Sequence, residues 1–154
     1  MARTASSAGV LIYRRTSGEL QVLLAHPGGP YWRRKTVGAW QLPKGQIESG
    51  EDAAATARRE AAEELGIALI GDLVPLGSIR QAGGKTVHAF AIEQDVDCAA
   101  IVSNRFELEW PPGSGRIETF PEIDAARWMA LAEARAMMLA SQRPLLDRLE
   151  ALLA

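Results

Sequence analysis

Residues 45–67 of the chain read GQIESGEDAAATARREAAEELGI. The part from about residue 51 to residue 65 is dominated by Ala, Arg and Glu and contains no Gly or Pro, which favours a helix. Gly66 then supplies the residue type that commonly ends helices. The stretch therefore predicts a helix over residues 51–65 that follows a glycine-containing loop.

Three glutamates of this helix share one face. Glu60, Glu63 and Glu64 are spaced i, i+3 and i+4, so they fall within one arc of a helix that turns about 100° per residue. Like charges at these spacings repel one another. Carboxylate oxygens suit Mg²⁺ or Mn²⁺, which bind through a few carboxylates together with substrate phosphate. The face thus predicts a divalent-cation site, and the alternative is a solvated acidic surface partnered by Arg58 and Arg59.

The whole stretch resembles the Nudix box, a pattern of glycine, glutamate and arginine at fixed spacing. Every fixed position of that pattern is present: Gly45, Glu51, Arg59, Glu60, Glu63, Glu64 and Gly66. Ala61 is a soft departure, because a larger aliphatic residue is usual there. Residues 38–44 and 126–134 also resemble the family segments on either side of the box. The loops at 28–32 and 110–112 are similar to a bacterial branch of predicted nucleoside-triphosphate pyrophosphohydrolases.

The resemblance implies roles for the box residues. Glu60, Glu63 and Glu64, together with the carbonyl of Gly45, would bind the metal. Arg59 would orient the glutamates through charge-assisted hydrogen bonds. Glu51 would lie at the start of the helix, where the macrodipole favours a negative charge, and would have a supporting role.

A general base is also needed, and in this family it is often either a box glutamate or an acid from a distant loop. Glu122, six residues before Trp128, is the first loop candidate. Glu118 is the second candidate, and Glu107 and Glu109 follow these two. The alternative for each of them is a solvated loop carboxylate.

The substrate-binding candidates lie before the box. Lys44 directly precedes the box glycine, and Arg33 and Arg34 lie in a Gly-, Pro- and cation-rich loop over residues 27–38, so all three are predicted to contact polyphosphate. Tyr31 and Trp32 of the same loop are predicted to stack a base. The alternatives are solvated cations and a loop packed on the domain.

The remaining patterns predict strands over 8–13, 20–26, 67–80, 85–94 and 126–130, with a turn at Gly83-Gly84. Residues 105–121 read as a polar loop broken by Pro and Gly. Residues 131–139 and 144–154 read as helices, and Trp40 and Trp128 as core residues. The fold class expected is α+β, an α/β/α sandwich of the Nudix type in which helices flank a mixed β-sheet. Residues 1–154 are expected to form a single domain.

The composition limits the classes of binding partner and the compartment that are expected. The 17 Lys and Arg against 19 Asp and Glu give a net charge of −2, so no global basic field attracts nucleic acid or an anionic membrane. Cys98 is the only cysteine, which excludes an internal disulfide and fits a reducing compartment. Residues 1–8 lack the apolar core of a signal peptide, so a cytoplasmic protein is expected.

The leading hypothesis is a Mg²⁺- or Mn²⁺-dependent hydrolase that cleaves a diphosphate linkage in a nucleoside triphosphate or dinucleoside polyphosphate. A second enzymatic interpretation is pyrophosphate removal from an RNA 5′ end or action on an inositol pyrophosphate. A third is a Nudix-fold sensor that binds a nucleotide without turnover; the complete set of box glutamates favours the enzyme. A homodimer formed through a loop or an edge strand stays open.

Overall fold

The computed structural model describes residues 6–81 and 83–154. Residues 1–5 belong to the stretch in which no signal peptide is expected, and they lie outside the described residues. The same holds for Ala82, next to the turn predicted at Gly83-Gly84.

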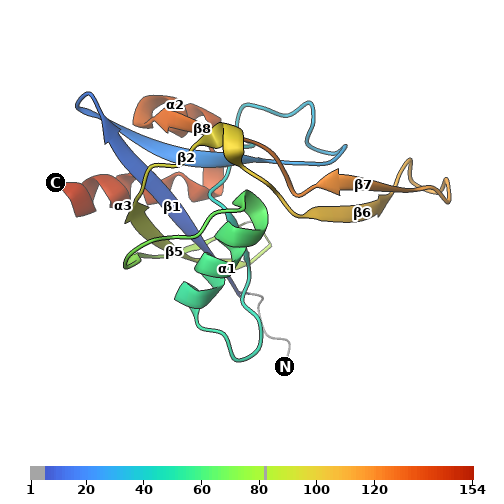
Figure 1. The fold of residues 1–154 in the computed structure, drawn as a ribbon, viewed down its shortest axis with the longest axis horizontal. Coiled ribbons are helices and arrows are strands. Elements are labelled where there is room, and N and C mark those ends of the chain that lie inside the picture. Colours follow the sequence, from blue (N-terminus) through green and yellow to red (C-terminus); the bar gives the residue numbers. More distant parts are fainter. Residues whose placement is uncertain (1–5, 82) are drawn as a thin grey trace.

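A mixed β-sheet runs through the middle of the molecule (Figure 1). Its strand order is β4-β5-β1-β2-β8, and the short β3 pairs with β1 beside this path. β1 and β5 are parallel, whereas the other neighbouring pairs are antiparallel. The strands span β1 (Ser6–Thr16), β2 (Glu19–Pro27), β3 (Lys44–Gln46), β4 (Val74–Arg80), β5 (Thr86–Glu93) and β8 (Ile123–Ala130).

Helices cover both faces of this sheet. Ala57, Ala61 and Leu65 of α1 (Ala53–Leu65) pack on one face, in a core that they share with Val10 and Ile12 of β1. α2 (Leu131–Met137) and α3 (Pro144–Leu153) pack on the other face, where Leu11 lies. Because helices cover both faces, β1 is buried continuously rather than at alternate positions. The predicted α+β fold, a mixed sheet flanked by helices, is confirmed.

The predicted box helix is present but begins later than expected. Asp52 is its N-cap and accepts a hydrogen bond from the backbone N–H of Ala55, so the helix starts at Ala53. Gly66 ends it in the left-handed region, with φ 69°, and its N–H donates to the carbonyl of Ala62. Glu51, which was expected at the start of the helix, therefore lies directly before the N-cap residue.

Residues 105–121 were predicted to form a loop, and that prediction was wrong. They form an antiparallel hairpin of β6 (Arg105–Glu109) and β7 (Ile117–Pro121), which projects from the body as an arm (Figure 1). Phe106 and Phe120 face each other across the two strands, with ring centroids 5.9 Å apart. Phe106, Leu108 and Trp110 alternate with the period of a strand. The charged residues between them and the Pro-Gly turn that follows led to the prediction of a loop instead.

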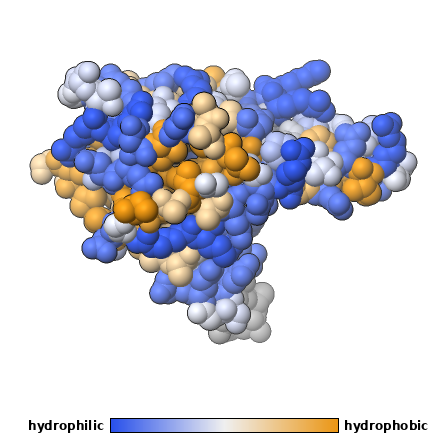
Figure 2. Space-filling view, viewed as in Figure 1, coloured by the Kyte–Doolittle hydropathy of each residue, from blue (hydrophilic) through white to orange (hydrophobic). Residues whose placement is uncertain are grey.

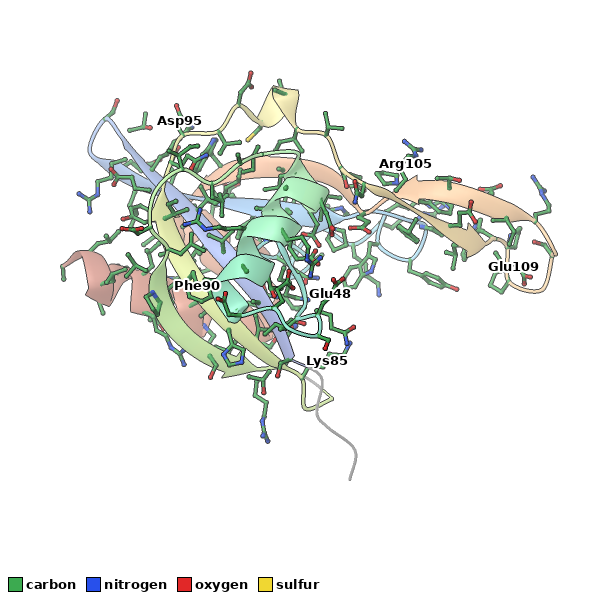
Figure 3. All side chains as sticks on the ribbon, turned by 60° about the horizontal axis from the view of Figure 1, so that its bottom comes forward. Glu48, Lys85, Phe90, Asp95, Arg105 and Glu109 are labelled. Atoms are coloured by element: carbon green, nitrogen blue, oxygen red, sulfur yellow. The ribbon has the colours of Figure 1, made fainter. Side chains whose placement is uncertain are left out.

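The surface of the arm is mostly hydrophilic (Figure 2). Arg105 and Glu109 mark the two ends of β6 along the arm, while Glu48 lies close to α1 (Figure 3).

Other boundaries differ by smaller amounts. Of the strand predicted over 67–80, only Val74–Arg80 pairs, because residues 67–73 run along the end of α1. Short 3-10 turns, η1 (Cys98–Ala100) and η2 (Ala140–Gln142), were not predicted. Trp40 is buried, as expected, and Trp128 is partly buried with its indole N–H donating to the carbonyl of Val96. Within the described residues, no helix is long and apolar enough to cross a membrane.

Candidate metal and nucleotide site

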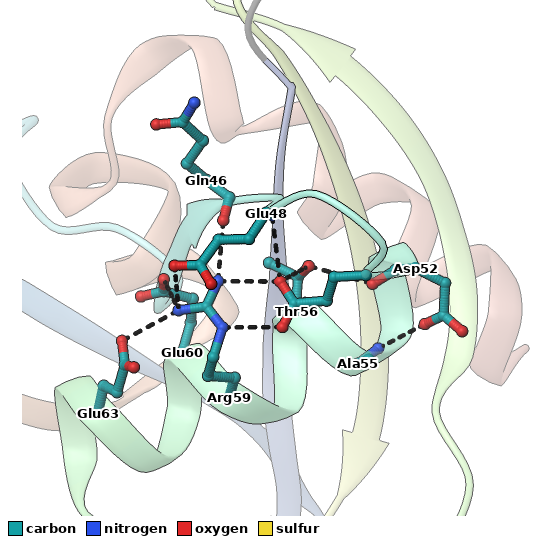
Figure 4. A network of polar contacts seen from close by, with 9 residues as sticks. Gln46, Glu48, Asp52, Ala55, Thr56, Arg59, Glu60 and Glu63 are labelled. Carbon is teal, nitrogen blue, oxygen red and sulfur yellow. Dashed lines mark hydrogen bonds and ion pairs between the residues drawn. The ribbon is translucent and has the colours of Figure 1, made fainter.

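Arg59 joins one carboxylate that lies just before α1, that of Glu51, to two on the helix itself, those of Glu60 and Glu63 (Figure 4). Its Nε donates to Glu51 at 2.8 Å, and its Nη1 donates to Glu60 at 2.8 Å and to Glu63 at 3.1 Å. The Arg59 guanidinium and the Thr56 hydroxyl lower the pKa of Glu51 to about 2. Glu51 is thus a permanently charged partner that holds Arg59 against the other two glutamates.

Gly45 of β3 lies directly beneath the Glu60 carboxylate. A Cβ atom added to Gly45 would be 2.0 Å from Glu60 Cδ, a distance at which something must shift. The absence of a side chain at Gly45 therefore lets the backbone of β3 approach the carboxylate of α1. Burial raises the pKa of Glu60, and Arg59 opposes that shift.

Glu64 is the most strongly perturbed acid of the helix face. Burial, followed by the charge of Glu60, raises its pKa to about 8. One Glu64 oxygen accepts a hydrogen bond from the backbone N–H of Lys44 at 3.2 Å. The Lys44 ammonium is also desolvated, since burial lowers its pKa while Glu64 and Glu60 raise it.

Glu122 is the loop acid that the fold brings to these glutamates. Burial and the charge of Glu63 raise its pKa, and its own charge raises the pKa values of Glu60 and Glu64. The other three acids lie on the arm instead. Glu109 accepts from the backbone of Gly113, Glu118 lies 3.7 Å from Arg116, and Glu107 is exposed.

A ladder of backbone hydrogen bonds holds Glu122 in place. The N–H of Asn104 donates to the carbonyl of Glu63, and the N–H of Glu122 donates to the carbonyl of Asn104, both at 2.8 Å. The N–H of Gly28 then donates to the carbonyl of Glu122 at 2.8 Å. The end of α1, the base of the arm and the glycine-rich loop are thereby joined through Glu122.

A cavity of about 160 Å³ lies beside Glu64 and Glu122. Trp32 and Lys44, two of the predicted substrate-binding residues, line it. Its remaining walls come from Ala25, Pro27, Gln41, Leu42 and Ile123, which the sequence analysis did not single out. Gln41 precedes the box by four residues, but only the fold brings it to the wall of the cavity.

The other three loop candidates lie away from this cavity. Tyr31 is 57% exposed and contacts Trp110 of the arm edge-on, with ring centroids 5.2 Å apart. Arg33 lines a second cavity of about 190 Å³, together with Phe120 and Asp124. Arg34 is exposed. The fold thus brings together Trp32 and Lys44 but separates them from Tyr31, Arg33 and Arg34.

The model of the NUDIX domain family matches residues 3–149 of the chain. The chain belongs to the Nudix family. Residues 45–67 are therefore its Nudix box, and α1 is the helix of that box. Proteins of this family are typically pyrophosphohydrolases.

An RNA pyrophosphohydrolase of Caulobacter vibrioides is 43% identical over 51 residues, which cover 30% of this chain and 30% of that relative. The chain thus matches less than a third of the relative's length. Among solved structures, the NUDIX domain of Shewanella oneidensis NrtR complexed with ADP ribose has a TM-score of 0.71 at 17% identity, covering 100% of this chain and 91% of that one. A C. elegans Ap4A hydrolase has a TM-score of 0.66 at 23% identity, covering 97% and 98%. Both structures share the Nudix fold.

The carboxylates of the Nudix box fit a divalent cation in their donor chemistry. Within the described residues, no three acidic, histidine or cysteine side chains converge on one point, since Arg59 bonds Glu60 and Glu63 while Glu64 faces the Lys44 N–H. The raised pKa values of Glu60, Glu64 and Glu122 nevertheless mark a place where negative charge is crowded and poorly solvated. A divalent cation held by these oxygens would stabilise their charged forms.

Proposed function

We propose that this Nudix protein hydrolyses a diphosphate linkage in a nucleoside triphosphate or dinucleoside polyphosphate with the help of Mg²⁺ or Mn²⁺. The observation that carries this proposal is the cavity lined by Glu64, Glu122, Lys44 and Trp32, whose two acids are electrostatically coupled to Glu60 and Glu63 of the same helix face. Carboxylates for a cation, an ammonium for phosphate and an aromatic ring for a base are the groups that such a substrate needs.

In this proposal Glu60, Glu63 and Glu64 hold the cation, with the Gly45 carbonyl as a further oxygen donor. When bound, the cation supplies neutralisation of the phosphate charge and acidifies water. Arg59 keeps Glu60 and Glu63 in place through its hydrogen bonds, and Glu51 keeps Arg59 in place. The Lys44 ammonium, which is poorly hydrated, binds a phosphate oxygen.

Glu122 is the proposed general base. Its carboxylate oxygen would take a proton from the attacking water, and its raised pKa makes it a stronger acceptor than an ordinary glutamate. Its backbone is fixed by the hydrogen bonds to Asn104 and Gly28, so its reach toward the phosphates is set by the fold. Cleavage would release a nucleoside monophosphate and a second phosphorylated product.

Two other functions have a specific observation behind them. The Caulobacter relative is an RNA pyrophosphohydrolase, but its match covers 30% of each chain, and the net charge of −2 provides no global attraction for RNA. The NrtR domain was solved with ADP ribose, which keeps a nucleotide sensor as the alternative without turnover. Inositol pyrophosphates remain a further substrate class to test.

The test is a product assay with Mg²⁺ across nucleoside triphosphates, dinucleoside polyphosphates, ADP-ribose, 5′-triphosphate RNA and an inositol pyrophosphate. We expect turnover of the first or second class, its loss in EDTA, and release of a nucleoside monophosphate. Nucleotide binding by calorimetry without turnover of any substrate would support the sensor instead. Turnover of RNA alone would favour the second enzymatic interpretation.

A further inference from the structure

We infer that Gln41 reads the nucleobase of the substrate, and that Gln142 sets which hydrogen bond Gln41 offers. The inference rests on the proposed function, because it places the base of a nucleotide in the cavity beside the Nudix box. It goes beyond that function by naming the kind of base preferred: one that presents a carbonyl oxygen rather than an amino group.

The amide of Gln142 has a defined orientation. Gln142 lies in η2, far along the chain from the box, and its side chain is fully buried. The backbone N–H of Leu42 donates to Gln142 Oε1 at 3.1 Å, and an N–H can be satisfied only by the oxygen of that amide. The Nε2 of Gln142 must therefore be the end that faces Gln41.

This orientation fixes the amide of Gln41 in turn. Gln142 Nε2 donates to Gln41 Oε1 at 3.4 Å, a long bond whose Gln142 end is fully buried. The Gln41 backbone is held as well, since Gln41 and Ala25 exchange N–H to carbonyl bonds of 2.9 and 2.7 Å. Within the described residues no hydrogen bond from Gln41 Nε2 is present, so the Gln41 NH₂ is the group offered to a ligand.

The cavity that Gln41 lines has the size and chemistry for the six-membered ring of a purine or pyrimidine, the ring that carries the hydrogen-bonding edge. Its volume of about 160 Å³ is close to the 150 Å³ of an engineered cavity that binds benzene. Ala25, Pro27, Leu42 and Ile123 are apolar walls, and Trp32 adds an aromatic surface. Lys44 and Glu64 lie on the same cavity, so a base that entered it would leave its phosphates beside the Nudix box.

A donor held at this position discriminates between bases. A guanine, hypoxanthine or uracil edge presents a carbonyl oxygen that accepts from the Gln41 NH₂. An adenine or cytosine edge presents an amino group in the same place, and two donors that face each other both stay unpaired. Sites built on a buried hydrogen bond reject the mismatched partner strongly, so we expect kcat/KM for GTP and ITP to exceed that for ATP by about tenfold or more.

Three variants test the inference on the full chain. Gln41→Met keeps the length of the side chain but removes the donor, so the GTP-to-ATP ratio of kcat/KM is expected to fall close to one. Gln41→Glu still accepts from Gln142 and presents an acceptor to the cavity, so the ratio is expected to turn toward ATP. Gln142→Glu accepts from Leu42 and from a reversed Gln41 amide, so the ratio is expected to move in the same direction. Gln21→Met, on a partly buried glutamine of β2 that bonds Arg14 and Glu19 and does not line the cavity, is the control for loss of a glutamine amide elsewhere in the sheet.

A binding measurement distinguishes the failure of this inference from the failure of the proposed function. Calorimetry of the wild type and Gln41→Met with GTP and ATP in EDTA measures base preference without turnover. A preference for GTP that Gln41→Met abolishes supports the inference even if the chain hydrolyses nothing. An unchanged preference in Gln41→Met would overturn it, and so would an equal loss of both nucleotides in Gln41→Glu, which would mean that Gln41 faces phosphate. The Gln41 variants lie on the cavity wall, so they decide the matter if Gln142→Glu does not fold.

Discussion

Glu63 and Glu64 differ in their surroundings although they are neighbours on α1. Glu63 accepts from Arg59 and is partly exposed, whereas Glu64 is more deeply buried and accepts from the Lys44 backbone. Both carboxylates face the cluster that we propose to hold the cation. The two side chains thus have the same proposed role, but the charged carboxylate of Glu64 is the more strongly destabilised by burial.

Replacing either glutamate should therefore separate activity from folding. We expect Glu63→Gln and Glu64→Gln to lower kcat in saturating Mg²⁺ by about 10²–10³-fold, because each removes a charged oxygen from the transition-state environment. Glu107→Gln, on the exposed face of the arm, is the control and should leave kcat unchanged. Wild-type turnover in both box variants, measured at saturating metal, would contradict the assigned site.

The raised pKa of Glu64 predicts a pH-dependent stability. The unfolded chain releases this proton near pH 4.5, whereas the folded protein keeps it to about 8. The unfolded state binds fewer protons over this interval, so the free energy of unfolding falls as pH rises from 4.5 to about 8. In EDTA, the Tm of Glu64→Gln should rise relative to that of the wild type through the same interval.

Thermal unfolding at several pH values measures this difference, with Glu107→Gln as the reference for a carboxylate outside the cluster. Saturating Mg²⁺ should reduce the difference, because a cation favours the charged form of Glu64. Parallel Tm curves for wild type and Glu64→Gln in EDTA would mean that Glu64 titrates like an ordinary glutamate.

Among the elements, β3 and α1 are joined by hydrogen bonds at Lys44 and Gln46 and by a close approach at Gly45. The Glu60 carboxylate occupies the space that a side chain at Gly45 would need. A substitution in a short strand is thus expected to act on a helix that follows it in the chain. The Nudix box is in this sense one structural unit of strand, loop and helix.

Gly45→Ala tests that unit. We expect it to displace Glu60, to lower kcat by about 10–100-fold, and to destabilise the fold by about 1–3 kcal/mol through overpacking. The double variant Gly45→Ala with Glu60→Asp shortens the facing side chain and should recover part of the stability but not the activity. Equal stability of the single and double variants, measured by denaturant unfolding, would show that the contact is not limiting.

The elements also differ in how well their sequences predicted them. α1 was predicted because an Ala-, Arg- and Glu-rich stretch without Gly or Pro ends at Gly66, and these signals act locally. The β6–β7 arm was missed because its apolar alternation is short and its strand pairing joins residues on either side of a Pro-Gly turn. A strand pair of this kind is stabilised by contacts that no local pattern contains.

At the scale of the whole molecule, the β4 edge of the sheet determines whether two copies could associate through this strand. β4 is an edge strand, and Arg148 of α3 donates through Nη1 to the carbonyls of Leu76 at 3.1 Å and Ser78 at 2.8 Å. A covered edge offers fewer free backbone groups to the strand of another molecule. Homodimer formation through the β4 edge is thus opposed by a side chain from the C-terminal helix.

Arg148→Ala should uncover these carbonyls. We expect a loss of about 1–2 kcal/mol in the free energy of unfolding and a stronger tendency to associate at high protein concentration. Arg80→Ala, which removes an exposed cation from the same strand, is the control for the change in charge. Sedimentation velocity over a concentration series measures the effect, and identical profiles for the two variants would refute a capping role for Arg148.

The sequence by itself determined the family and the acidic face of the helix. Both follow from spacing along one short stretch, since i, i+3 and i+4 positions meet on any helix. The tertiary structure alone decided which of four distant acids approaches that face, and it is Glu122, because backbone hydrogen bonds tie it to Asn104 and Gly28. It also decided that Gln142 meets Gln41, since residues about a hundred positions apart come together only when both layers pack on the sheet.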